Sequence, residues 1–180
     1  MAYRSFQHND LIMVRDALDI AEDATNDFYK FSTSQWKRSQ YDVKTLRSLK
    51  RDEISHQAFA LLSKQERRIS DFESKTKGRD FYFICLQDHS ILEALKRDEN
   101  LGLLPILVYV LTHELVHVVR FCNFLQRYNA SQNEEIDKEE KVVHSTTFEI
   151  LEDISLPELD YVLDVYKDHR VCEMAVSQPI

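Results

Sequence analysis

Residues 103–125, with the sequence LLPILVYVLTHELVHVVRFCNFL, constrain the fold more than any other part of the chain. Pro105 falls in the first turn, where a helix needs no backbone N–H donor, and the next twenty residues contain neither Gly nor Pro. The segment therefore predicts one long, buried helix. His113, Glu114 and His117 interrupt its apolar run and make it too polar for a membrane span. Burying such groups without a partner is costly, and a metal ion would compensate them.

The composition favours a single helical domain. The chain has 180 residues, of which 43% are apolar, so we expect one domain over residues 1–180 with a continuous core. Two Gly and three Pro are few for a protein of many short strands, which predicts an all-α fold. Three widely spaced Cys without a CxxC pair suggest neither a disulfide framework nor a rubredoxin-type iron site.

The net charge and the N-terminal sequence argue against a nucleic-acid partner and against a membrane location. A formal net charge of −8 argues against a nucleic-acid partner, because phosphate binding needs a basic face. The N-terminal sequence MAYRSFQHND has no apolar signal region, and no other run has the length of a membrane span without charges. We therefore expect a cytoplasmic protein with no membrane partner.

Apolar residues at helical spacing predict a bundle of four long helices over about residues 9–154. The helices are expected at about 9–34, 42–69, 103–128 and 134–154. The polar stretch and the segment FYFICL between residues 70 and 88 are interpreted as a crossover, with FYFICL either extended or a buried connection. A short helix at about 90–97 and an additional C-terminal helix at about 158–171 complete the prediction.

Each long helix places an acidic residue on or near its apolar stripe, and three of the four add a histidine about one turn away. If these side chains meet at the bundle centre, four carboxylates would repel one another, and two divalent cations would cancel their charge. The pattern predicts a dinuclear metal site. The candidate ligands are Glu22, Glu53, His56, His113, Glu114, His117, Glu140 and His144.

This layout resembles the ferritin-like di-iron carboxylate family, with rubrerythrin-like members as the nearest relatives. The resemblance implies a ferritin-like four-helix bundle with a crossover, two iron ions, and redox chemistry with peroxide, dioxygen or Fe²⁺. Glu53 and either Glu140 or Glu114 would bridge the metals. Because no CxxC pair supplies an internal electron donor, the partner would be an external electron-donor protein, and a homo-oligomer is compatible with the family. Glu140 and His144 depart from the family pattern, since they are four rather than three residues apart.

The segment HELVH supports a second interpretation. It resembles HExxH zinc metallopeptidases, in which two His from one helix bind a single zinc ion and the intervening Glu polarises the attacking water. His113 and His117 would be ligands, Glu114 the general base, and either Glu140 or His144 the third ligand. Such a peptidase lays its substrate along a sheet edge, and only FYFICL could form a strand here. Three of the candidate ligands also remain without a role.

Ordinary structural roles are open for several of the same residues. Glu22 stands among three aspartates and Glu140 in the charged run EEIDKEEK, so either could belong to a solvated face. Glu53 and His56 could form a surface pair, and His113 could hydrogen-bond to a neighbouring helix. If none of these residues binds metal, the chain is a non-catalytic helical interaction protein.

Overall fold

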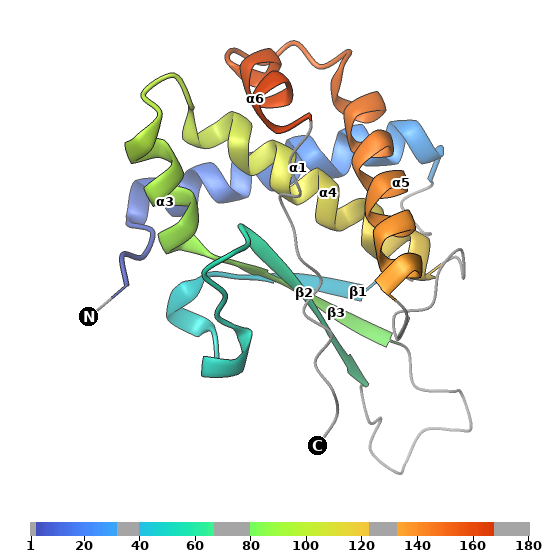
Figure 1. Cartoon of the computed structure of the whole chain (residues 1–180), viewed down its shortest axis with the longest axis horizontal. Coiled ribbons are helices and arrows are strands. Elements are labelled where there is room, and N and C mark those ends of the chain that lie inside the picture. Colours follow the sequence, from blue (N-terminus) through green and yellow to red (C-terminus); the bar gives the residue numbers. More distant parts are fainter. Residues whose placement is uncertain (1–2, 32–39, 67–79, 123–132, 168–180) are drawn as a thin grey trace.

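The structure, a computed structural model, describes residues 3–31, 40–66, 80–122 and 133–167 of the chain. Helices dominate this part of the chain, and a small sheet lies beside them (Figure 1). The helices are α1 (His8–Tyr29), α3 (Asp88–Arg97), α4 (Leu103–Cys122), α5 (Asn133–Leu151) and α6 (Leu159–Tyr166). The strands are β1 (Gln40–Lys44), β2 (Ala60–Glu66) and β3 (Asp80–Leu86), and two short 3-10 helices, η1 (Leu46–Ser48) and η2 (Arg51–Glu53), follow β1.

The central element is α4, as the apolar run predicts. Every residue from Pro105 to Val119 is buried, and the helix packs against α1, α3, α5, α6 and the sheet. By length and hydropathy α4 could cross a membrane, but 83% of that window is buried inside the protein, which is typical of a core helix. The expected extension of this helix toward residue 128 lies outside the described residues.

The sheet has the strand order β1-β3-β2, with β1 parallel and β2 antiparallel to β3. Because side chains alternate along a strand, β3 buries both of its faces. Tyr82, Ile84 and Leu86 join the main core under the helices. Phe83 and Cys85 pack in a second, smaller cluster on the opposite face. The segment FYFICL is therefore a strand, the extended alternative that the sequence left open.

The helix predicted over residues 42–69 is wrong as far as residue 66, where description of this segment stops. Leu46 and Leu49 have helical spacing, but the chain forms β1, two 3-10 turns and β2 there. These turns form without glycine. Buried polar side chains that directly follow β3 bind backbone groups of this segment. The Asp88 carboxylate accepts hydrogen bonds from the N–H groups of Phe6 and Leu46, at 2.8 and 3.0 Å. The predicted bundle therefore lacks its second helix.

The other predicted helices are confirmed, with shifted ends. The first ends at Tyr29 rather than near residue 34, because Lys30 adopts a left-handed conformation with φ of 55°. The expectation at 90–97 corresponds to α3, and that at 134–154 to α5, which is shorter at its C-terminal end. The C-terminal helix is α6, and residues 168–171 of the expected range are not described. The prediction of a mostly helical chain is thus confirmed, with a sheet added.

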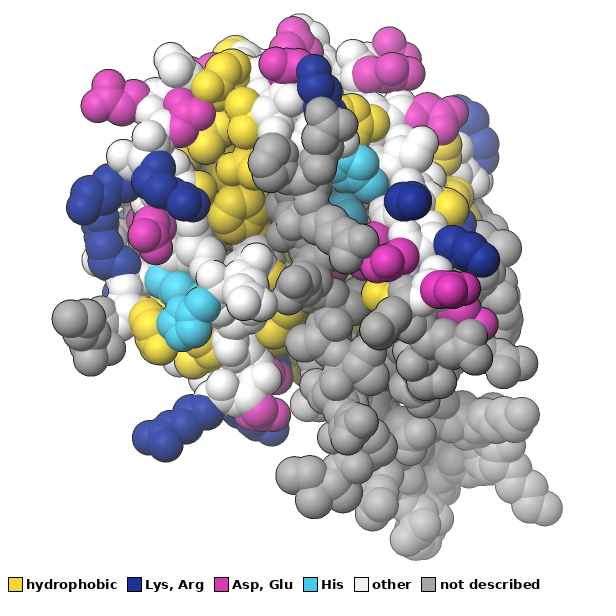
Figure 2. Space-filling model, viewed as in Figure 1, with side chains coloured by type: hydrophobic (Ala, Val, Ile, Leu, Met, Phe, Trp, Pro, Cys, Tyr) yellow, Lys and Arg dark blue, Asp and Glu magenta, His cyan; other side chains and the backbone are white. Residues whose placement is uncertain are grey.

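Charges of both signs are interspersed on the face that Figure 2 shows, with hydrophobic side chains gathered between them. Among the side chains coloured by type in this view, the basic ones do not form a continuous patch of the kind that binds nucleic acid. The absence of a nucleic-acid partner stays a prediction.

Cys85 should be chemically inert in the folded protein. Burial, with a smaller contribution from the Glu53 carboxylate, raises the pKa of its thiol to about 12, so the reactive thiolate is scarce. We expect Cys85 to resist iodoacetamide at about pH 8.5 in the native state and to react in denaturant. Peptide mass spectrometry measures the labelling. Equal labelling rates in the native and unfolded protein would contradict the burial of this thiol.

Candidate metal centre

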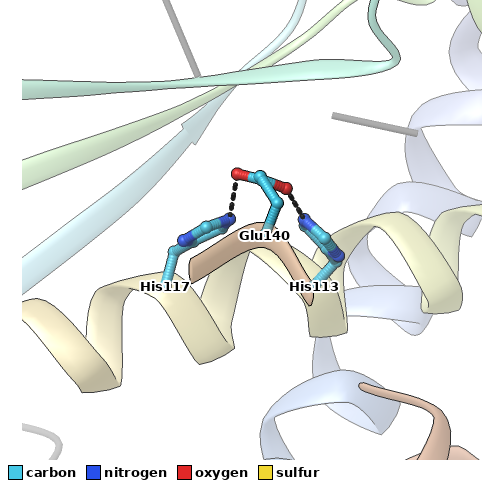
Figure 3. Close-up of side chains that lie close together, drawn as sticks. All are labelled: His113, His117 and Glu140. Atoms are coloured by element: carbon cyan, nitrogen blue, oxygen red, sulfur yellow. Dashed lines mark ion pairs between the residues drawn. The ribbon is translucent and has the colours of Figure 1, made fainter. Parts of the chain in front are cut away.

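Among the described residues, His113, His117 and Glu140 form the one group of three or more His, Cys, Asp or Glu side chains that could hold a metal ion. Their ligand atoms all lie within 4.8 Å of one another. Nε2 of His113 lies 3.5 Å from Oε2 of Glu140, and Nε2 of His117 lies 3.2 Å from Oε1. Figure 3 shows both imidazoles reaching from one helix toward the carboxylate, which stands between them.

The sequence explains why the two imidazoles share a side. His113 and His117 are four residues apart on α4, so they lie one above the other on one helix face. The ring of His117 stacks on that of Phe121 at 5.8 Å between centroids, and Phe121 stacks on Tyr82 of β3 at 5.9 Å. The sheet therefore supports the imidazole from behind. Glu140 is supplied by α5, which packs on α4.

The distances in this group fit a bound metal ion. Zinc bonds of 2.0–2.2 Å at tetrahedral angles put neighbouring ligand atoms about 3.3–3.6 Å apart. The two observed N···O distances are 3.2 and 3.5 Å. Both imidazoles are buried; within the described part of the chain neither Nδ1 atom has a hydrogen-bond partner, and each Nε2 atom faces the Glu140 carboxylate. An ion between the three side chains would satisfy both Nε2 atoms.

The Glu140 carboxyl has the charge that a ligand needs. Its side chain is 12% exposed, and this burial alone would raise its pKa. His113 and His117 act more strongly in the opposite direction, and together they lower the pKa to about 2. The carboxylate is therefore ionised at neutral pH, as metal binding requires.

Glu114 lies beside the two candidate histidines rather than in line with them. Successive residues on an α-helix are about 100° apart, so the side chain that follows His113 leaves the helix in a different direction. Glu114 is only 2% exposed and is not a member of the three-ligand group. A buried carboxylate next to a metal site, but outside the ligand set, is suited to accept and donate protons.

The structure does not bring Glu53 and His56 to this group. Glu53 lies in η2, where its carboxylate pairs with Lys44 at 2.8 Å and accepts the N–H of Lys50 at 2.8 Å. Burial raises the pKa of this carboxyl, but the two lysines outweigh burial and the net shift is downward. His56 is exposed, and its Nε2 lies 3.0 Å from the hydroxyl of Tyr3. Both residues lie between β1 and β2, and their partners are structural: Lys44 and Lys50 for Glu53, and Tyr3 of the N-terminal segment for His56.

Glu22 is also separate from the group. The hydroxyl of Tyr41 donates a hydrogen bond to its carboxylate and so links α1 to β1. Burial, followed by the nearby charges of Asp19 and Asp23, raises the pKa of the Glu22 carboxyl. Its role here is a contact between a helix and the sheet.

His144 lies one turn beyond Glu140 on α5 but has other partners. Its Nε2–H donates to the carbonyl oxygen of Lys167 at 2.6 Å. In the neutral ring this leaves Nδ1 to accept a hydrogen bond from the Tyr109 hydroxyl, at 3.1 Å. Of the two residues that the sequence offered as third ligand, Glu140 is the one that meets the histidines.

Sequence reasoning missed an ion pair next to the site. Arg120 binds Glu139 with two nitrogens, Nε to Oε1 at 2.5 Å and Nη2 to Oε2 at 2.8 Å. The available signal was the position of Arg120, a single cation in an apolar helix, three residues after His117. A buried cation of this kind requires an acidic partner on a neighbouring element.

No family model, curated protein or solved structure matches the chain.

Proposed function

We propose that this protein is a zinc-dependent metallopeptidase in which His113, His117 and Glu140 hold one zinc ion and Glu114 is the general base. The observation that carries the proposal is the meeting of the two HELVH histidines with a carboxylate from a separate helix, at 3.2 and 3.5 Å. Two His and one Glu form a known ligand set of catalytic zinc sites, which keep a fourth position for water or substrate.

The proposed peptide hydrolysis would use the zinc ion, Glu114 and the two histidines. Bound zinc would supply a Lewis acid that polarises the scissile carbonyl and makes water acidic near neutral pH. Glu114 would take a proton from the attacking water as the new C–O bond forms. It would then give that proton to the leaving amine as the C–N bond breaks, so the products are a carboxylic acid and an amine, which at neutral pH are the carboxylate and the ammonium ion. His113 and His117 would stay neutral as ligands.

A small sheet lies next to the helix that carries two of the proposed zinc ligands. β2 pairs with β3 along its whole length, Ala60–Glu66. β2 also packs against α4, which carries the histidines. Figure 1 shows the sheet beneath this helix. The HExxH zinc peptidases that the site resembles lay an extended substrate along a sheet edge, and a sheet next to α4 is compatible with that arrangement.

Metal analysis tests the proposal directly. Protein purified without added metal should contain one zinc per chain and cleave a fluorogenic peptide, and a chelator should remove both properties. Free zinc at about 100 times its Kd should stabilise the fold by about 2.7 kcal/mol. For a chain of this size that raises Tm by roughly 5–11 °C, measurable by differential scanning fluorimetry. Protein that binds no zinc would overturn the proposal.

The alternative function predicted from the sequence, a di-iron site with an external electron donor, assumes a ferritin-like four-helix bundle whose second helix is not formed over residues 40–66. Its second helix would have to bring Glu53 and His56 to the histidines of α4, whereas these residues pair with Lys44 and Tyr3. About two irons per chain would favour this alternative, and a chain without metal would favour the non-catalytic interaction protein. Homo-oligomer formation and a cytoplasmic location stay predictions.

A further inference from the structure

A buried ion pair joins α4 to α5 immediately beside the proposed metal ligand. Arg120 contacts both carboxylate oxygens of Glu139, at 2.5 and 2.8 Å. The side chains of Arg120 and Glu139 are 17% and 7% exposed. Because a planar guanidinium binds a planar carboxylate at two points, the contact sets the orientation of the two helices as well as their separation.

The pair uses the same two helices as the metal ligands. Arg120 follows His117 by three residues and therefore lies about one turn further along α4. Glu139 directly precedes Glu140 on α5. A shift of α5 that moved the Glu140 carboxylate away from the imidazoles would also have to break the two-point contact at the preceding residue.

A second polar contact lies on the other side of Glu140. The Tyr109 hydroxyl lies 3.1 Å from Nδ1 of His144, one turn further along α5. This contact is a single hydrogen bond, and the same imidazole is also bonded to Lys167 at the end of α6. The Arg120 contact joins α4 and α5 at two points and is therefore the stronger constraint on how α5 meets α4.

We propose that Arg120 and Glu139 are positioning residues, which hold α5 so that Glu140 completes the metal site. The inference rests on the proposed function, because it assumes that the three side chains bind zinc. Buried ion pairs contribute little net stability, since the cost of removing both charges from water offsets their attraction. The role of this pair is therefore to orient the adjacent ligand, Glu140, rather than to stabilise the fold.

The test compares two matched double variants of the full chain. Arg120→Met with Glu139→Gln removes the pair next to the site. Lys44→Met with Glu53→Gln removes a similarly buried pair that the structure places in the sheet and its turn. We expect the first variant to bind zinc about 10–100-fold more weakly, as changes to groups that orient ligands do. The second should keep the affinity of the unmodified protein. Competition with a chromophoric chelator measures both.

Cobalt substitution supplies a readout that a purely structural role would not change. The visible spectrum of the Co²⁺ protein reports ligand geometry, and we expect it to change only in the Arg120 variant. Unchanged zinc affinity and spectrum, or equal losses in both variants, would overturn the inference while zinc binding by the unmodified protein upholds the proposed function. If the unmodified protein binds no zinc, both fail.

If the double variant does not fold, a milder single variant tests the same inference. Arg120→Lys preserves the charge but replaces the two-point contact with a single one. Its native circular dichroism should be retained, with zinc affinity between that of the unmodified protein and that of the double variant. Affinity equal to that of the unmodified protein in this folded variant would overturn the inference.

Discussion

A Glu114→Gln variant is expected to lose peptide hydrolysis by about 10²–10⁴-fold while it still binds one zinc per chain. The amide keeps the size of the side chain but cannot accept the proton of the attacking water. Because Glu114 is buried beside the two histidines and is not a member of the ligand group, its replacement leaves the three ligand side chains in place. Measurement of kcat/KM with a fluorogenic peptide tests the loss of hydrolysis, and measurement of zinc content by mass spectrometry tests the retention of the metal.

The control for this variant is Glu93→Gln, the same change at an exposed position of α3. It should leave both hydrolysis and zinc content unchanged. Loss of metal from Glu114→Gln would identify this residue as a ligand, as the di-iron interpretation expects. Retained hydrolysis with zinc bound would exclude Glu114 as the general base.

The features that could be predicted from the sequence are those set by neighbouring residues. The apolar run from Pro105 onward requires a buried helix whatever the rest of the chain does, and α4 has that form. The spacing of His113 and His117 puts them on one helix face, so their meeting needs no tertiary information. Helical spacing likewise predicted α1, α3, α5 and α6, with errors mainly at their ends.

The segment around β1 and β2 shows why the fold prediction was incomplete. Leu46, Leu49 and Ala60 match a helical period, but their burial comes from turns and strands. Scarcity of Gly and Pro suggested that turns were absent there. The turns are instead held by Gln87, whose amide donates to the Glu53 carbonyl at 2.9 Å, and by the Asp88 carboxylate. Such support comes from distant residues, and local propensity does not reveal it.

The choice between Glu140 and His144 also depends on tertiary structure. Both residues lie on one side of α5, one turn apart, and local spacing cannot tell which of them meets α4. The way the two helices pack decides it, and the Arg120 pair, which the sequence analysis missed, is part of that packing. Among the described residues, the candidate ligands that meet therefore come from two helices only, α4 and α5.

Replacing each of these two residues by Ala should separate ligand from neighbour. Glu140→Ala is expected to weaken zinc binding by more than about 100-fold, since changes around a ligand already cost 10–100-fold and this one removes a ligand. His144→Ala should weaken it by less than about tenfold, because its imidazole binds Tyr109 and Lys167 instead. Chelator competition gives both affinities. Equal losses, or a larger loss in His144→Ala, would mean that α5 presents a different face to the histidines, and the proposed zinc site would then have to be abandoned.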